Sequence, residues 1–379
     1  MGKWNVLLAV IAILLVVMVV TPRFSQAAPD AAIVTPVPVV KADLIALENA
    51  LRIAGETSKK AIPAYLIYQP AVDHFEISQD GKTALVWMAL LDPQTKKPVA
   101  TEPGLAIAKR TDLNSPWQMT LPTAKDYSTM VQNLPETLLS KDKKSLFGTI
   151  TQSARSPAEN KVYSGYLLPW EGGKRVWLTG SVAHFTTYNS CSWVSVNGES
   201  HSTCSYAFDF ANGTMFRLLA SRGGSVIGSR WTCVDNDHNC LNYIALEDTS
   251  TSPVTTAIYL HLAQNSIPAA LRINGTFVNQ GDFIGLADNT GLSTGHHLHF
   301  MVVANRWMGS GYGGSYWWGD SVDITFDEVD VNGGRPRLCS EAYYTPQYGV
   351  QCHIANTSAG EYFDNWYISG NRGSKPPTA

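Results

Sequence analysis

Apolar residues in the first third of the chain follow two different periods. Between residues 44 and 54 they recur every three or four positions, which predicts one amphipathic helix. Asp43 is placed to cap this helix and Gly55 is placed to end it. The residues that follow alternate or run apolar in short stretches, such as 84–91, with turn residues between them. A helix followed by an antiparallel sheet predicts a small α+β domain over residues 41–138, which contains no cluster of catalytic residue types.

The pattern changes after a polar stretch at residues 139–162, which we interpret as a connector or processing site. From residue 163 to 367, short strand-like runs alternate with turns of Gly, Asn and Ser. This alternation predicts a second, β-dominated domain built on antiparallel sheet. Residues 368–379 predict a flexible tail. A chain of 379 residues has the length for two such domains.

The longest apolar run lies near the amino terminus and predicts export. Val6 to Val20 is uninterrupted, and residues 25–27 (Ser-Gln-Ala) fit the small-x-small pattern that signal peptidase accepts. We therefore expect a signal peptide over residues 1–28, followed by an extended linker over residues 29–40. The run is shorter than the roughly 20 residues that a membrane span needs. Arg23 keeps an uncleaved N-terminal anchor open as the alternative, and only then would the membrane be a partner.

Composition narrows the class of partner and the compartment. Charged residues make up 16% of the chain and the net charge is −3, so electrostatics does not favour nucleic acid as a partner. The apolar leader predicts that the chain is secreted or held in the extracytoplasmic cell envelope, and we expect it to be a monomer.

Six cysteines, all in the second predicted domain, fit an oxidising compartment because disulfides persist outside the cytosol. Zinc fingers need cysteine or histidine pairs at close spacing, which the cysteines here lack. The order of the cysteines suggests three local disulfides, although sequence alone leaves the pairing open. The suggested pairs are Cys191 with Cys204, Cys233 with Cys240, and Cys339 with Cys352.

Histidines and one aspartate form the candidate chemistry of the second domain. His297 and His299 alternate along a predicted strand and so project from one face, as a metal-binding pair or as part of an exposed polar face. His261 lies in an apolar strand, where it is either a hydrogen-bonded core histidine or a functional one. Asp209 stands among Ala and Phe residues, where a carboxylate is costly to bury unless it binds a metal or a donor. His201 supplies another imidazole nearby.

Residues 289–300, Asn-Thr-Gly-Leu-Ser-Thr-Gly-His-His-Leu-His-Phe, carry a family resemblance. The segment resembles the signature of the lysostaphin-like, or LytM-type, zinc endopeptidases and the related β-lytic metalloendopeptidases. Residues 281–285 and 259–262 match the same family in order and spacing. The resemblance extends from about residue 168 to residue 303.

The resemblance implies one zinc ion per chain, held by His201, Asp209 and His299 with a fourth position left for water. It also implies that His261 and His297 are the catalytic residues beside that water. Which of these two histidines acts as the general base stays open.

Two departures from the family pattern affect the ligand set. The family usually places its first ligand four residues before the aspartate, where this chain has Ser205. His201 lies eight residues before Asp209 instead, and His184 is its rival for the first zinc position. His296 stands where the family usually has proline, and strand alternation points it to the other face.

The resemblance implies a zinc-dependent endopeptidase that hydrolyses peptide bonds through a metal-activated water. Its expected substrates are bacterial cell-wall peptidoglycan cross-bridges or glycine-rich peptides. The alternative is a non-catalytic envelope protein that binds peptidoglycan or activates another cell-wall hydrolase. A polysaccharide hydrolase would need a second carboxylate across a groove from Asp209. We interpret the α+β domain as the propeptide of a zymogen, with a targeting domain as the alternative.

Overall fold

The computed structural model describes most of the chain beyond residue 40. The described residues are 41–59, 62–66, 68–93, 95–141, 143–144, 161–180, 193–196, 199–202, 206–336, 342–345, 349–352 and 366–372. The expected signal peptide and linker lie outside them, as do His184, Cys191, Cys204 and Cys339. Within these ranges, no helix combines the length and the apolar character that a membrane crossing requires.

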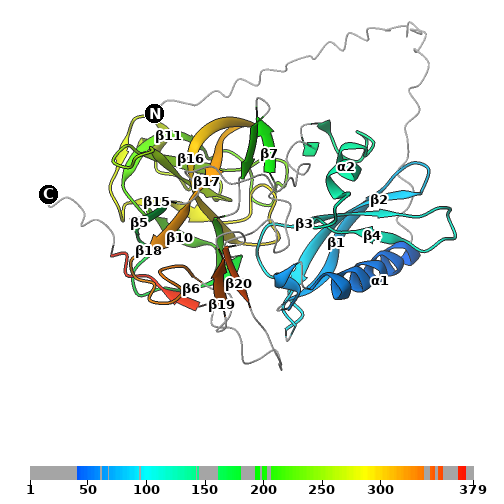
Figure 1. The fold of residues 1–379 in the computed structure, drawn as a ribbon. Helices are drawn as coiled ribbons and strands as arrows, with labels where there is room; N and C mark the ends of the chain where they lie inside the picture. The colour runs from blue at the N-terminus through cyan, green and yellow to red at the C-terminus, as the bar shows by residue number, and fades with distance from the viewer. Residues whose placement is uncertain are drawn as a thin grey trace, which may run out of the picture. The chain divides into compact units, whose positions relative to one another are not determined.

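The first part of the fold is one helix on a four-stranded antiparallel sheet (Figure 1). The sheet has the order β1-β2-β3-β4, and a second short helix follows it. This part confirms the predicted small α+β domain. Its elements are α1 (Lys41–Ser58), the 3-10 helix η1 (Pro63–Leu66), β1 (Gln69–Ile77), β2 (Thr83–Leu91), β3 (Gly104–Lys109), β4 (Gln118–Thr120) and α2 (Tyr127–Gln132).

The ends of α1 differ from the prediction. Asp43 lies inside the first turn and does not cap the helix, because its carboxylate accepts hydrogen bonds from Arg110 and the Trp117 indole. Gly55 lies within the helix and does not end it. A Cβ at Gly55 would stand 3.0 Å from the ring of Pro70 in β1, so the glycine permits close packing of helix on sheet.

The second part is dominated by a nine-stranded sheet, which confirms the predicted β-rich antiparallel domain. The strand order is β14-β11-β12-β13-β16-β9-β6-β21, with β17 also paired to β16. The bounds are β6 (Arg175–Gly180), β9 (Ala207–Ala211), β11 (Gly224–Arg230), β12 (Tyr243–Asp248), β13 (Thr255–Leu260), β14 (Phe277–Val278), β16 (His297–Gly311), β17 (Gly314–Ser321) and β21 (Trp366–Ile368).

Two-stranded pairs and a short 3-10 helix complete this part. β5 (Val162–Tyr166) runs parallel to β18 (Asp323–Phe326), whereas the other pairs are antiparallel. Those pairs are β10 (Phe216–Leu219) with β15 (Phe283–Ala287), β7 (Trp193–Val196) with β8 (Glu199–Ser202), and β19 (Ala342–Thr345) with β20 (Gly349–Cys352). The 3-10 helix is η3 (Ala269–Arg272).

The two faces of β9 and β16 carry different residues because side chains alternate along a strand. Phe208 and Phe210 of β9 and Phe300 of β16 are buried in the main apolar core, where each packs near Phe326. The residues between them project from the opposite face. That face holds Asp209 and the histidines of β16.

One of the three suggested disulfides lies within the described residues. Cys233 and Cys240 are bonded with an S–S distance of 2.04 Å and close a loop between β11 and β12. A disulfide fits a protein that folds outside the cytosol. The other two suggested pairs involve cysteines whose side chains lie outside the described part of the chain.

Candidate metal centre

Asp209 and His299 form the base of the candidate site. They are register partners on the antiparallel strands β9 and β16, and both side chains are fully buried. Nδ1 of His299 lies 3.1 Å from Oδ1 of Asp209. Trp318 of β17 stacks on the His299 ring, with ring centroids 6.4 Å apart and planes inclined by 17°. Sheet pairing therefore holds a carboxylate and an imidazole together in a water-poor environment.

His261 and His297 stand beside this pair with their rings 4.5 Å apart, centroid to centroid. The Nδ1 atom of His297 lies 3.0 Å from the Gly295 carbonyl oxygen, and that of His261 lies 2.7 Å from the Thr290 carbonyl oxygen. A carbonyl only accepts, so each Nδ1 carries a proton, and in a neutral ring the Nε2 atom then presents a lone pair.

The two Nε2 atoms face the cluster. Nε2 of His297 lies 3.9 Å from Oδ1 of Asp209. Among the described residues, neither the Nε2 of His261 nor that of His297 has a hydrogen-bond partner, although both atoms are buried. Buried polar atoms are nearly always satisfied in native proteins, so two orphaned acceptors side by side indicate a place for a ligand or reacting group.

The backbone at His261 is strained in a way that aims its ring. His261 follows β13 directly and has φ of 64°, in the left-handed region that non-glycine residues rarely adopt. Such conformations cost on the order of 1–3 kcal/mol and persist where surrounding contacts enforce them. Here the Asp288 amide donates to the His261 carbonyl at 2.7 Å, and the His297 amide donates to the Asp288 carbonyl at 3.0 Å. Asp288 thus ties the two histidine backbones together.

Glu102 completes the cluster from the α+β part. Its Oε1 lies 2.6 Å from Nδ1 of His299 and 3.7 Å from Nε2 of His261. Sequence reasoning missed this residue, because the loop between β2 and β3 has no periodic pattern and no metal-binding motif. Only the folded chain brings residue 102 next to residue 299.

The charges of the cluster shift the pKa values of its members. Burial lowers the pKa of His299, but the Glu102 and Asp209 carboxylates outweigh that effect and raise it to about 10. Burial and the repulsion from Asp209 both raise the pKa of Glu102. Attraction and hydrogen bonding to His299 and His261 outweigh them and lower this pKa to about 2. Burial and the neighbouring His261 lower the pKa of His297 to about 4, so this imidazole is neutral at pH 7.

The donor set fits a metal ion. Glu102, Asp209 and His299 are all buried and offer ligand atoms that lie within 4.8 Å of one another. Carboxylate oxygen and imidazole nitrogen are ordinary zinc ligands. The two predicted ligands whose side chains are described, Asp209 and His299, belong to this group.

Three other histidines singled out in the sequence do not belong to the described cluster. His201 lies on β8, opposite Val194 of β7, and β8 contacts β17. Its side chain and all of His184 lie outside what the structure describes, so the choice of first ligand stays a prediction. The His296 side chain is 40% exposed and hydrogen-bonds Asp288, away from the Asp209 and His299 cluster.

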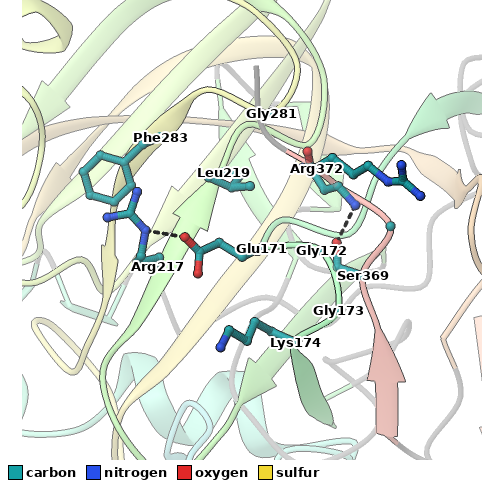
Figure 2. Close-up of a pocket in the computed structure, with 12 residues that line it drawn as sticks. Glu171, Gly172, Gly173, Lys174, Arg217, Leu219, Gly281, Phe283, Ser369 and Arg372 are labelled. Atoms are coloured by element: carbon teal, nitrogen blue, oxygen red, sulfur yellow. Dashed lines mark hydrogen bonds and ion pairs between the residues drawn. The ribbon is translucent and has the colours of Figure 1, made fainter. Parts of the chain in front are cut away.

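A separate polar pocket of about 750 Å³ lies elsewhere in the β-rich part (Figure 2). Arg217 pairs with Glu171 at 2.7 Å and lies over the Phe283 ring, so the pocket's acid and one of its bases neutralise each other. None of the sequence-predicted site residues lines this pocket. The candidate chemistry therefore belongs to the histidine cluster.

Comparison with known proteins agrees with the geometry. Residues 203–309 match peptidase family M23, so the chain contains an M23 peptidase domain that includes Asp209, His261, His297 and His299. No curated protein matches the sequence.

Two solved structures are similar in part. One is described as a zinc containing peptidase from Vibrio cholerae, with 19% identity over 58% of this chain and 52% of that chain and a TM-score of 0.25. The other is Helicobacter pylori Csd3, with 13% identity over 70% of this chain and 56% of that chain and a TM-score of 0.23. The matched part thus spans about half the length of each structure.

Proposed function

We propose that this M23 domain is a zinc-dependent endopeptidase of the bacterial cell envelope. The observation that supports the proposal is the buried group of Asp209 and His299, flanked by two histidines whose buried Nε2 atoms have no hydrogen-bond partner among the described residues. Asp209 and His299 would hold the ion, with His201 as the third ligand and His184 as its rival. Three protein ligands leave the open position that catalytic zinc requires.

The chemistry follows from how the chain holds its two non-ligand histidines. Zinc bound at such a site supplies a Lewis acid that makes water nucleophilic near neutral pH. His261 and His297 each have Nδ1–H fixed on a carbonyl, so only Nε2 is left to exchange a proton. The low pKa of His297 keeps it available as a proton acceptor at pH 7. One histidine would accept the proton and the other would stabilise the carbonyl oxygen or protonate the leaving amine.

The proposed substrates are peptidoglycan cross-bridges or glycine-rich peptides. This substrate class is supported by the resemblance at residues 289–300 and by the match to family M23. A secreted or envelope-bound location is supported by the apolar N-terminal run and by the Cys233–Cys240 disulfide.

Metal content tests the proposal directly. The full chain should bind about one zinc ion, measured by elemental analysis, and His299→Ala should bind much less. His296→Ala is the matched control, since it removes an imidazole from the same segment but outside the cluster. Lysis of purified peptidoglycan is measured in parallel, before and after limited proteolysis, with and without a chelator.

The opposite result supports a different class of function. A chain that binds peptidoglycan but holds no zinc, and lyses nothing even after proteolysis, would be a non-catalytic envelope protein. Zinc binding with chelator-sensitive cleavage of a glycine-rich peptide alone would keep the peptidase and remove the cell-wall role.

A further inference from the structure

The sheet face that carries the candidate metal centre continues from β16 across β9 and β6 to β21. His297 on β16 is the register partner of Ala211 on β9, and Ala211 is also the partner of Trp177 on β6. Trp177 in turn opposes Trp366 on β21, the strand that ends the described sheet. Directly opposed residues project from the same face of a sheet. The four residues therefore form one row across the strands, with a site histidine at one end and two tryptophans at the other.

The two faces of β6 and β21 have opposite environments. Val176 and Leu178 of β6 are buried in the main apolar core, and Tyr367 of β21 packs against that core. The residues between them share the face of the candidate metal centre, and there Trp366 is 39% exposed and Ile368 is 62% exposed. Single exposed apolar residues are ordinary, but a contiguous apolar patch marks a binding surface.

The two indole rings of this patch are held in one orientation. Trp177 and Trp366 meet edge to face, with ring centroids 4.7 Å apart and planes inclined by 72°. The Arg175 guanidinium lies over the Trp366 ring at 4.3 Å from its centroid. A Cβ at Gly213, in the turn after β9, would stand 3.4 Å from the Trp177 ring. These contacts fix both rings and so lower the entropy cost of binding a ligand on them.

We propose that Arg175, Trp177 and Trp366 form a subsite that binds the sugar chain of a substrate in which peptides are attached to a glycan. This inference rests on the proposed cell-wall peptidase function and names the part of the substrate that is recognised away from the scissile bond. Trp177 and Trp366 lie outside residues 203–309, so the match to family M23 does not account for them.

The chemistry of the subsite favours a sugar over an apolar peptide side chain. The face of an indole carries negative charge density, and it attracts the weakly positive C–H groups on one side of a pyranose ring. The Arg175 guanidinium offers N–H donors beside the Trp366 ring, and these suit hydroxyl and acetamido oxygens. An apolar side chain would use the rings but would have no need of the guanidinium.

The spacing of the row fits a peptide that connects the candidate metal centre to the glycan. Three strand spacings of about 4.8 Å separate the strands of His297 and Trp366, which makes about 14 Å. An extended peptide spans about 3.3–3.6 Å per residue, so about four residues cover this distance. A substrate whose scissile bond lies at the candidate metal centre would therefore place a sugar, attached about four residues away, on the two tryptophans.

Binding of a peptide-free sugar tests the subsite without depending on cleavage. The full chain is titrated in a calorimeter with the trimer of N-acetylglucosamine, which the wild type should bind. Trp366→Ala and Trp177→Ala should each weaken binding at least about tenfold, because a stacking surface is lost. Phe277→Ala is the matched control and should bind as wild type, since Phe277 is 64% exposed on β14, at the opposite end of the sheet.

Conservative variants separate stacking from simple apolar contact. Trp366→Tyr keeps an aromatic face and should retain most of the affinity for the trimer, whereas Trp366→Leu keeps apolar bulk and should lose it. If Trp366→Leu binds the trimer as well as Trp366→Tyr does, the patch is only an apolar contact surface and the sugar subsite is overturned. If Trp177→Ala does not fold, the variants of the exposed Trp366 decide the question.

Cleavage assays separate this proposal from the function on which it rests. Trp366→Ala should raise KM for soluble peptidoglycan fragments several-fold and leave kcat unchanged, because the subsite binds substrate and transition state alike. Cleavage of a glycine-rich peptide without sugar should not change. Cleavage by a wild-type chain that does not bind the trimer overturns the subsite and leaves the peptidase standing. Trimer binding by a chain that cleaves nothing overturns the peptidase and leaves the sugar-binding surface.

Discussion

Asp209 and His299 oppose each other directly in the antiparallel register of β9 and β16, with Nδ1 3.1 Å from Oδ1. Opposed side chains on paired strands have Cβ atoms about 4.5–5.5 Å apart, so the sheet itself sets the distance between these two side chains. Sites on regular strands hold their geometry more tightly than sites on loops. The fold alone therefore positions the two proposed metal ligands.

Removing one of these two proposed ligands should weaken metal binding strongly without unfolding the sheet. Asp209→Asn keeps the volume of the side chain but loses its charge. We expect zinc affinity to fall by at least about a hundredfold, because loss of a residue that merely hydrogen-bonds a metal ligand already lowers affinity by up to that factor. Competition with a chromogenic chelator measures the affinity. Circular dichroism checks the fold, and unchanged zinc affinity in a folded Asp209→Asn chain would remove Asp209 from the site.

The two flanking histidines should behave differently from the ligands. His261→Ala and His297→Ala should each retain zinc and lower turnover about 10²–10⁴-fold, the range for loss of a general acid or base. Turnover is measured before and after limited proteolysis, with zinc content determined on the same samples. His296→Ala, in the same segment, should change neither quantity. Loss of zinc from His297→Ala would instead make His297 a ligand.

Much of this centre follows from strand alternation in the sequence. The alternation of His297 and His299 placed both on one face, and the Ala and Phe neighbours of Asp209 indicated a buried carboxylate. These inferences depend on short-range periodicity, which the folded sheet preserves.

Strand and helix periodicity could not predict contacts between residues far apart in the sequence. Glu102 lies almost two hundred residues from His299, in a loop whose composition resembles any other loop. The expected cap at Asp43 also failed, because Arg110 and Trp117, distant in sequence, bind its carboxylate. Side-chain contacts with residues distant in sequence therefore determine the positions of both carboxylates.

A glycine beside the site should be sensitive to a single methyl group. Gly291 has φ of 79°, and a Cβ there would stand 2.8 Å from the Leu241 side chain. Gly291→Ala should lower the free energy of unfolding by about 1–3 kcal/mol, since both strain and a clash act. It should also disturb the Thr290 carbonyl that orients His261. Urea denaturation and turnover measure the two effects.

Gly275 offers the matched control for this substitution. Its φ of 88° is also left-handed, yet no described atom lies within 4 Å of the position of its Cβ. Gly275→Ala should therefore show the strain alone and leave turnover unchanged. An equal loss of stability in both variants would mean that the contact with Leu241 contributes nothing.

Asp288 should give the folded chain a distinct dependence on pH. Burial raises the pKa of this carboxyl from 3.8 to about 6, with Asp235 adding to the effect and His296 opposing it. Between pH 4 and 6 the folded chain then holds a proton that the unfolded chain has lost, so stability contributed by the neutral acid falls as pH rises. Asp288→Asn removes this titration and should gain stability relative to wild type as pH rises from 4 to 7.

Urea denaturation of both chains at pH 4 and pH 7 measures this difference. His296→Gln removes the group that opposes the rise in the Asp288 pKa. The stability of the His296→Gln chain should therefore fall more steeply with pH than that of the wild type. Asp237→Asn, in the adjacent disulfide loop, is the control for loss of a carboxylate that does not contact His296. A difference between wild type and Asp288→Asn that is the same at both pH values would show that Asp288 titrates alike in the folded and unfolded chains. Its part at the site would then be limited to the backbone hydrogen bonds that join His261 and His297.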